Sequence, residues 1–158
     1  MKLDELIKKA RERDLSDASA LQDLFDVCRL YESENFEEAH SVNKEVRRLS
    51  AKYAKEQNSF KMFDLNKRSL LFDAPYDFDA AIRYAEWDRE PKKKFYMPRR
   101  KQLLPVVKAM QRLSERKIRI LGVMAPPGVG KTTIELMFMV MEGLKNPDLS
   151  ILMGSHSN

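Results

Sequence analysis

Hydrophobic residues in the first half of the chain recur with the period of an α-helix. Leu3, Leu6, Ile7 and Ala10 stand at positions i, i+3, i+4 and i+7, the spacing that gathers apolar side chains on one face of an amphipathic helix. Positions 21, 24, 25 and 28, and positions 42, 46, 49 and 53, repeat this pattern. We therefore expect three helices, the second capped by Ser16 and the third beginning near residue 35.

The pattern is weaker over residues 60–90, where proline first enters the chain. Residues 69–73 can end a helix or form a short strand, and Pro75 interrupts them. Asp77 is a good N-cap residue, so we expect a helix from there to Trp87. A longer helix is then expected from about residue 98 to residue 114, kinked or shifted by an internal proline.

The last third of the chain carries the pattern of strands around a helix. Residues 117–124 form an apolar run typical of a buried strand, and residues 150–154 form a second one. An apolar helix is predicted between them, over residues 132–141. Strand, loop, helix and strand in this order make a βαβ unit with a parallel pair of strands.

The predicted fold class is therefore α/β, with a helical region over residues 1–90 and the start of an α/β domain over residues 91–158. Two parallel strands cannot cover both faces of such a sheet. We accordingly expect the chain to be the N-terminal piece of a longer protein, with an incomplete second domain.

Composition divides the chain at a similar place. All five glycines lie at residue 122 or later and all seven prolines at residue 75 or later, which supports a helical first half. Residues 1–90 hold 16 Lys and Arg against 20 Asp and Glu, a net charge of −4; residues 91–158 hold 13 against 4, a net charge of +9. The basic part suits a polyanionic partner or ligand.

Several functional classes are disfavoured by the residues that the chain lacks. The single cysteine, Cys28, excludes an intramolecular disulfide and lies on a predicted apolar stripe, so we interpret it as a core residue. His40 and His156 are the only histidines, too few for a typical zinc site. No apolar run is long enough to span a membrane and no secretion signal begins the chain, so we expect a cytoplasmic protein.

The chemistry of the chain is concentrated in the sequence Ala-Pro-Pro-Gly-Val-Gly-Lys-Thr at residues 125–132. It fits the phosphate-binding loop (Walker A), with Ala in place of the first Gly. A chain that wraps a triphosphate must turn successive N–H groups inward, and glycine permits the backbone angles and the close approach. The helix that follows adds the positive end of its dipole.

This motif predicts ATP and Mg²⁺ as ligands. Lys131 is expected to contact the β- and γ-phosphates as the catalytic cation, and the Thr132 hydroxyl to hold Mg²⁺. The prolines lack an N–H group and more plausibly stiffen the entrance of the loop, while Thr133 lies on the helix surface or supports the site. The predicted nucleotide-binding residues of the loop are Ala125, Pro126, Pro127, Gly128, Val129, Gly130, Lys131, Thr132 and Thr133.

A basic segment with two aromatic residues precedes the loop. Residues 92–101 contain six Lys and Arg, with Phe95 and Tyr96 between them. An aromatic ring beside cations can stack on adenine, and a glutamine amide can pair with its edge, so Tyr96, Arg99 and Gln102 are the candidates for the adenine side. Two alternatives remain open: the charges solvate a linker, or they contact DNA phosphates.

Taken together, residues 95–104, 124–133 and 155–157 resemble the large terminase subunit of tailed bacteriophages, most closely the versions from phages of Gram-positive bacteria. The resemblance covers about residues 92–158. It implies an ATP-driven motor that packages double-stranded DNA into a procapsid in the bacterial host cytoplasm. It also implies an adenine-binding segment ahead of the loop, contacts with the portal protein and the small terminase subunit, and a full-length protein able to form homo-oligomers.

The sequence also departs from that family. The variable positions of the loop hold no arginine, no apolar strand ending in Asp-Glu (Walker B) follows it, and the nuclease domain is absent. We therefore expect nucleotide binding with negligible turnover from this chain. The alternatives are another P-loop ATPase such as a helicase loader, or a non-enzymatic helical module that binds DNA or a protein partner.

Overall fold

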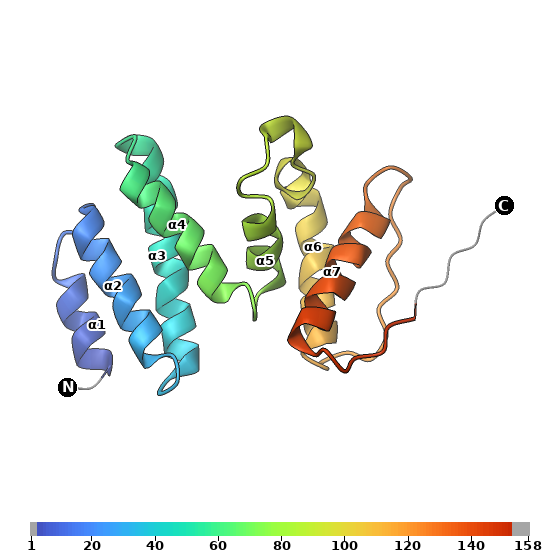
Figure 1. Ribbon diagram of the computed structural model, residues 1–158, viewed down its shortest axis with the longest axis horizontal. Helices are drawn as coiled ribbons and strands as arrows, with labels where there is room; N and C mark the ends of the chain where they lie inside the picture. Colours follow the sequence, from blue (N-terminus) through green and yellow to red (C-terminus); the bar gives the residue numbers. More distant parts are fainter. Residues whose placement is uncertain (1–2, 153–158) are drawn as a thin grey trace. The chain divides into compact units, whose positions relative to one another are not determined.

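The computed structural model describes residues 3–152, and the regular structure in this range is entirely helical (Figure 1). The described structure is 68% helical and contains no strand. The fold is therefore all-α, and the predicted α/β class with its βαβ unit is wrong. The chain divides into two compact units, Met1–Asp73 and Ala74–Asn158.

Unit 1 is made of four helices, each packed against a sequence neighbour. They are α1 (Leu3–Arg11), α2 (Ala18–Tyr31), α3 (Phe36–Glu56) and α4 (Phe60–Asp73). The N-cap of α2 is Asp17, whose side chain accepts from the Ala20 N–H, and not Ser16 as predicted. Asn35 caps α3, which begins next to the predicted position, and residues 69–73 end a helix and do not form a strand.

The predicted apolar stripes of α1 to α3 meet in the core of unit 1. Cys28 is fully buried there, as predicted, and its thiol donates to the Leu24 carbonyl at 3.2 Å. Burial, helped by the nearby charge of Asp73, raises the pKa of this thiol to about 12. Cys28 is therefore an inert core side chain and not a nucleophile.

A seam of buried polar residues joins α3 to α4. The Asn43 side chain donates to the Ser69 carbonyl, and the Asn66 side chain donates to the Arg47 carbonyl at 2.7 Å. At its end, Asp73 lies 3.0 Å from an Arg47 nitrogen and 2.5 Å from Nδ1 of His40. The remaining His40 nitrogen, Nε2, lies 3.0 Å from a Glu32 oxygen. These contacts fix the register of the two helices.

Unit 2 contains α5 (Phe78–Ala85), the short 3-10 helix η1 (Pro91–Lys93), α6 (Tyr96–Ser114) and α7 (Lys131–Lys145), and both α5 and α7 pack against α6. Asp77 caps α5 as predicted, although the helix ends at Ala85. Pro105 lies inside α6, which is assigned as one helix. The apolar core is formed mainly by Phe78, Ile82, Tyr96, Leu103, Val107, Met110, Ile134 and Met141.

Neither predicted strand forms among the described residues, and the exposure of the side chains in these segments shows why. Residues 117–124 run as an irregular segment between α6 and α7 (Figure 1), with Ile120 89% and Met124 100% exposed. Residues 150–152 are also irregular, and the other residues predicted for that strand lie outside the described range. A strand needs a paired neighbour for its backbone N–H and C=O groups, and neither segment has one among the described residues.

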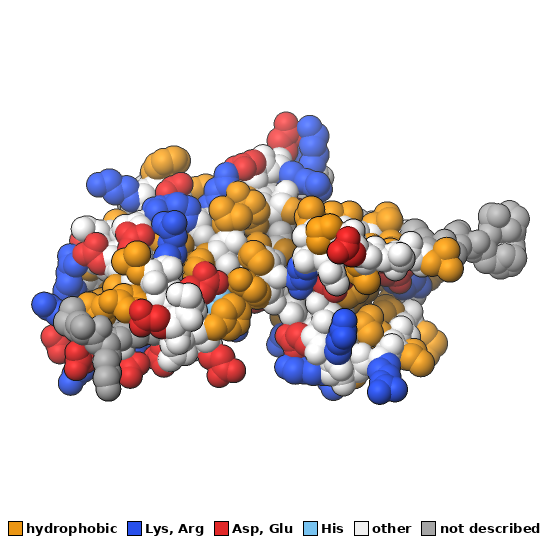
Figure 2. Space-filling model, turned by 60° about the horizontal axis from the view of Figure 1, so that its bottom comes forward, with side chains coloured by type: hydrophobic (Ala, Val, Ile, Leu, Met, Phe, Trp, Pro, Cys, Tyr) orange, Lys and Arg blue, Asp and Glu red, His pale blue; other side chains and the backbone are white. Residues whose placement is uncertain are grey.

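On the face shown in Figure 2, both units mix charged and hydrophobic side chains. Among residues 3–152, no helix is both long enough and apolar enough to cross a membrane.

Candidate functional site

The predicted phosphate loop connects the irregular segment to the N-terminus of α7 (Figure 1). Gly128 and Gly130 have φ angles of +77° and +98°, in the left-handed region that other residues rarely adopt. Gly130 is the N-cap of α7 and Lys131 is its first residue. The two glycines therefore turn the backbone immediately before a 15-residue helix.

The Lys131 side chain folds back along this loop. Its ammonium nitrogen donates to the Ala125 carbonyl at 2.5 Å, which links the end of the loop to its beginning. Pro126, Pro127 and Gly128 are exposed along the loop, whereas Val129 is partly buried against the core of unit 2. Val129 thus anchors the loop on the core, while residues 126–128 face solvent.

The N-terminus of α7 offers several hydrogen-bond donors. Its N-cap supplies no side-chain acceptor, and the first helical N–H to find a backbone acceptor is that of Ile134, at 3.1 Å from the Gly130 carbonyl. The N–H groups of the first turn have no intrahelical partner by geometry. Thr132 is exposed and Thr133 is half-buried in this turn. The arrangement suits an anion.

Phe95 brings the basic segment to this loop. A Cβ added to Gly130 would lie 2.1 Å from Cζ of Phe95, so the tip of the ring lies directly against the Gly130 backbone. Glycine is therefore required at position 130 for two reasons, its positive φ and this contact. The Arg99 guanidinium lies over the same ring, 5.1 Å from its centroid. Arg99 is thereby connected to the loop through Phe95.

Tyr96, the predicted adenine-side residue, lies in the core of unit 2. It is fully buried, and its hydroxyl donates to Asp79 at 2.6 Å. Burial and this hydrogen bond raise the pKa of Tyr96. Burial opposes the charge of Asp79, but hydrogen bonds from Arg100 and Tyr96 outweigh it and lower the pKa of that carboxyl. Gln102 is exposed on α6, and no described contact connects it to the loop.

Glu86 is a site residue that the sequence did not indicate. Its carboxylate is fully buried and accepts the backbone N–H groups of Phe95, Tyr96 and Met97 at 2.7–3.1 Å. It therefore caps α6, whose own N-cap residue makes no side-chain hydrogen bond. Phe95 was not among the predicted candidates either, although it lies in the basic segment that the sequence singled out. No local pattern distinguishes Glu86 from its exposed acidic neighbours.

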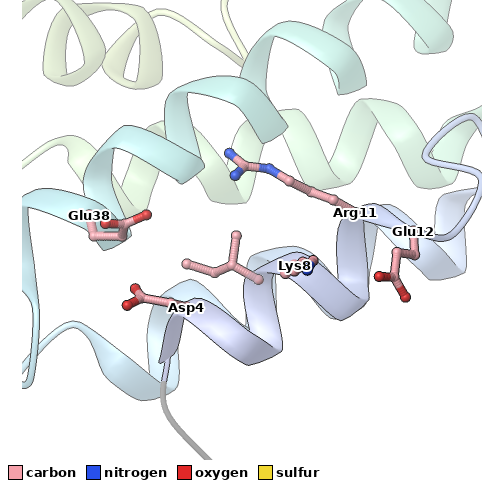
Figure 3. Close-up of a pocket in the computed structure, with 6 residues that line it drawn as sticks. Asp4, Lys8, Arg11, Glu12 and Glu38 are labelled. Carbon is pink, nitrogen blue, oxygen red and sulfur yellow. The ribbon is translucent and has the colours of Figure 1, made fainter.

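Other features of the described residues are less specific. A shallow hollow in unit 1 is lined by Asp4, Ile7, Lys8, Arg11, Glu12 and Glu38 (Figure 3). Charges of both signs surround it, and Arg11 is paired with Glu45 at 2.6 Å. Within residues 3–152, no His, Cys, Asp and Glu side chains are grouped to hold a metal ion.

Comparison with known proteins adds no relative. No family model, curated protein or solved structure matches the chain.

Proposed function

We propose that the loop at residues 125–132 binds the triphosphate of ATP together with Mg²⁺. The observation that carries the proposal is one continuous arrangement: two glycines at positive φ lead into a helix without a side-chain cap, whose first residue is a lysine anchored on the loop. Backbone N–H groups of this turn would hold phosphate oxygens. Glycine, lysine and threonine are also the residue types that the phosphate loop requires.

The residues fit both ligands by their chemistry. Lys131 would exchange its bond to the Ala125 carbonyl for a charge-assisted bond to phosphate. The exposed Thr132 hydroxyl lies in the first turn of α7 and would hold Mg²⁺. Bound Mg²⁺ supplies charge neutralisation for the phosphates.

The resemblance to terminase large subunits leads us to propose further that the full-length protein is a DNA-packaging ATPase that works with a portal protein and a small subunit in a bacterial host.

Lys131→Ala is expected to weaken Mg·ATP binding about 10- to 100-fold, because hydrogen bonds to charged groups contribute about 1.5–3 kcal/mol. Titration of a fluorescent ATP analogue with Mg²⁺ measures this. The matched control is Lys108→Ala, which removes an exposed cation from the same unit and should leave the affinity unchanged. Equal affinities for the wild-type chain and Lys131→Ala would contradict the assignment.

A second proposal concerns double-stranded DNA as partner. Helix α6 contains no acidic residue, and three of its exposed cations, Lys101, Lys108 and Arg112, are spaced so that they share one face. Such a row suits contact with successive phosphates, which gives salt-dependent affinity without sequence preference. This face favours a role in which the same unit contacts both nucleotide and DNA.

Changing Lys101, Lys108 and Arg112 together to Gln should weaken duplex DNA binding and reduce the slope of log K against log[salt] by about 2–3. Filter binding or anisotropy over a salt series measures the slope. The control is the matched triple change of Lys44, Arg48 and Lys52, which are exposed on α3 in the net-acidic part of the chain. An equal loss in both triple variants would indicate a general charge effect and contradict the α6 surface.

A further inference from the structure

The loop itself supplies little charge to neutralise a polyphosphate. Lys131 is the one charged residue among residues 125–132. Transfer of a phosphoryl group typically uses a second cation, often an arginine from outside the loop, to balance the charge that spreads over the phosphate oxygens. A second cation at this site would have to come from a segment that packs against the loop.

Phe95 belongs to a segment that packs against the loop. The Cζ end of its ring lies against Gly130, while the ring itself is half-buried against the core of unit 2. Its backbone N–H is held by the buried Glu86 carboxylate at 2.7 Å. Phe95 is thus fixed at both its backbone and its ring, and the position of Gly130 depends on it.

Arg99 lies one helical turn further along α6 and rests on the same ring. Its guanidinium is 5.1 Å from the ring centroid, and one of its nitrogens donates to the Phe95 carbonyl at 3.5 Å. Arg99 is exposed and has no acidic partner within the described part of the chain. Two of the neighbouring cations are engaged elsewhere, since Lys94 donates to the Trp87 carbonyl and Arg100 is paired with Asp79.

We infer that Arg99 is the second cation of the polyphosphate site and that Phe95 is the positioning residue that holds both Arg99 and Gly130 in place. This inference rests on the proposed function, because it needs a phosphate at the loop. A guanidinium held on an aromatic face keeps its donors directed outward and loses less rotamer freedom on binding. The phosphate chain, and not the adenine ring, is then the group that Arg99 recognises.

Three probes separate these roles: Mg·ATP, inorganic tripolyphosphate and adenosine. Arg99→Gln should weaken Mg·ATP and tripolyphosphate about 5- to 20-fold, less than Lys131→Ala because the Arg99 side chain is exposed, and leave adenosine binding unchanged. Arg116→Gln, the loss of an exposed arginine charge just after the C-cap of α6, should change none of the three. A loss confined to Mg·ATP and adenosine, or no loss in Arg99→Gln, would overturn the assignment to phosphate.

Phe95→Tyr tests the positioning role. It keeps the ring under Arg99 but adds an oxygen to Cζ, the atom that lies against Gly130. We expect at least a 10-fold loss of tripolyphosphate affinity while unit 2 stays folded. Fluorescence of Trp87, the single tryptophan of the chain, reports the folding. Phe138→Tyr, a hydroxyl added elsewhere in the same core, should leave the affinity unchanged. Wild-type affinity in Phe95→Tyr would overturn the role of Phe95.

The Lys131→Ala variant distinguishes the two levels of the proposal. If it binds tripolyphosphate as well as the wild-type chain does, the proposed function itself fails. If Lys131→Ala binds tripolyphosphate more weakly than the wild-type chain while Arg99→Gln and Phe95→Tyr bind it normally, only the inference about Arg99 and Phe95 fails. If Phe95→Tyr unfolds unit 2, Arg99→Gln decides alone, because its side chain is exposed.

Discussion

Replacing Asp73 by Ala is expected to destabilise unit 1 by about 3–5 kcal/mol, the range for removing one partner of a buried ion pair. Asp73 is only 1% exposed, and its carboxylate lies between Arg47 and His40, both of which are themselves buried. The variant removes the carboxylate that compensates their burial and leaves a space beside them. A loss of this size is a large part of the stability of a small domain.

Urea unfolding followed by circular dichroism measures the loss, and labelling of Cys28 assigns it to unit 1. The thiol is fully buried in that unit, so it reacts only when the unit opens, and opening should become about 100-fold or more easier. The control is Asp64→Ala, which breaks an exposed pair with Arg68 at 2.8 Å and should cost under about 1 kcal/mol. Similar losses in both variants would show that the buried network contributes no more than a surface pair.

Helices α1 to α3 of unit 1 were predictable because their information is local, whereas the weaker apolar pattern of α4 left its residues 69–73 open between a helix and a strand. An apolar face repeats every three to four residues, and a capping side chain stands next to the helix that it caps. The polar seam was not predictable in the same way. Asn43 and Asn66 each bond to a group on the other helix, 26 and 19 residues away, and nothing in the local pattern selects those partners.

The predicted strands failed because an apolar run does not specify its own pairing. A short apolar segment is compatible with a buried strand only if a neighbour supplies hydrogen bonds. Within the described residues the segment at 117–124 has no such neighbour, and its side chains at 120 and 124 face solvent. The βαβ interpretation was based on the order of the segments, and that order does not establish hydrogen bonding between two strands.

The candidate site was likewise predictable where its residues are contiguous in sequence and unpredictable where they are not. The loop could be found from the sequence because its residues are contiguous and glycine is chemically required at two of them. The contact between the Phe95 ring and Gly130 could not be found in this way, since Phe95 lies 35 positions earlier in the sequence. Between two adjacent aromatic residues the sequence favoured Tyr96, yet successive helix positions differ by about 100° in direction. In the structure Tyr96 lies in the core and Phe95 contacts the loop.

The N-terminus of α6 depends on one carboxylate, so Glu86→Ala is expected to destabilise unit 2 by about 3 kcal/mol or more. Three backbone N–H groups, those of Phe95, Tyr96 and Met97, lose their acceptor. Hydrogen bonds to a charged group contribute about 1.5–3 kcal/mol each, and a donor left buried adds its desolvation cost. The negative charge also lies at the positive end of the α6 dipole.

Glu86→Ala should also weaken tripolyphosphate binding under conditions in which unit 2 is still folded. The reason is that Phe95 loses the backbone contact that fixes its ring against Gly130. Trp87 fluorescence in a urea series measures the stability of unit 2, and a tripolyphosphate titration without urea measures the affinity. Glu86→Gln, which retains one acceptor oxygen, should lie between Glu86→Ala and the wild-type chain in both stability and tripolyphosphate affinity. Glu90→Ala serves as the control, since the Glu90 side chain is 70% exposed and pairs with the equally exposed Lys93. If Glu86→Ala matched Glu90→Ala in stability, the buried carboxylate would not be the cap on which α6 and the loop depend.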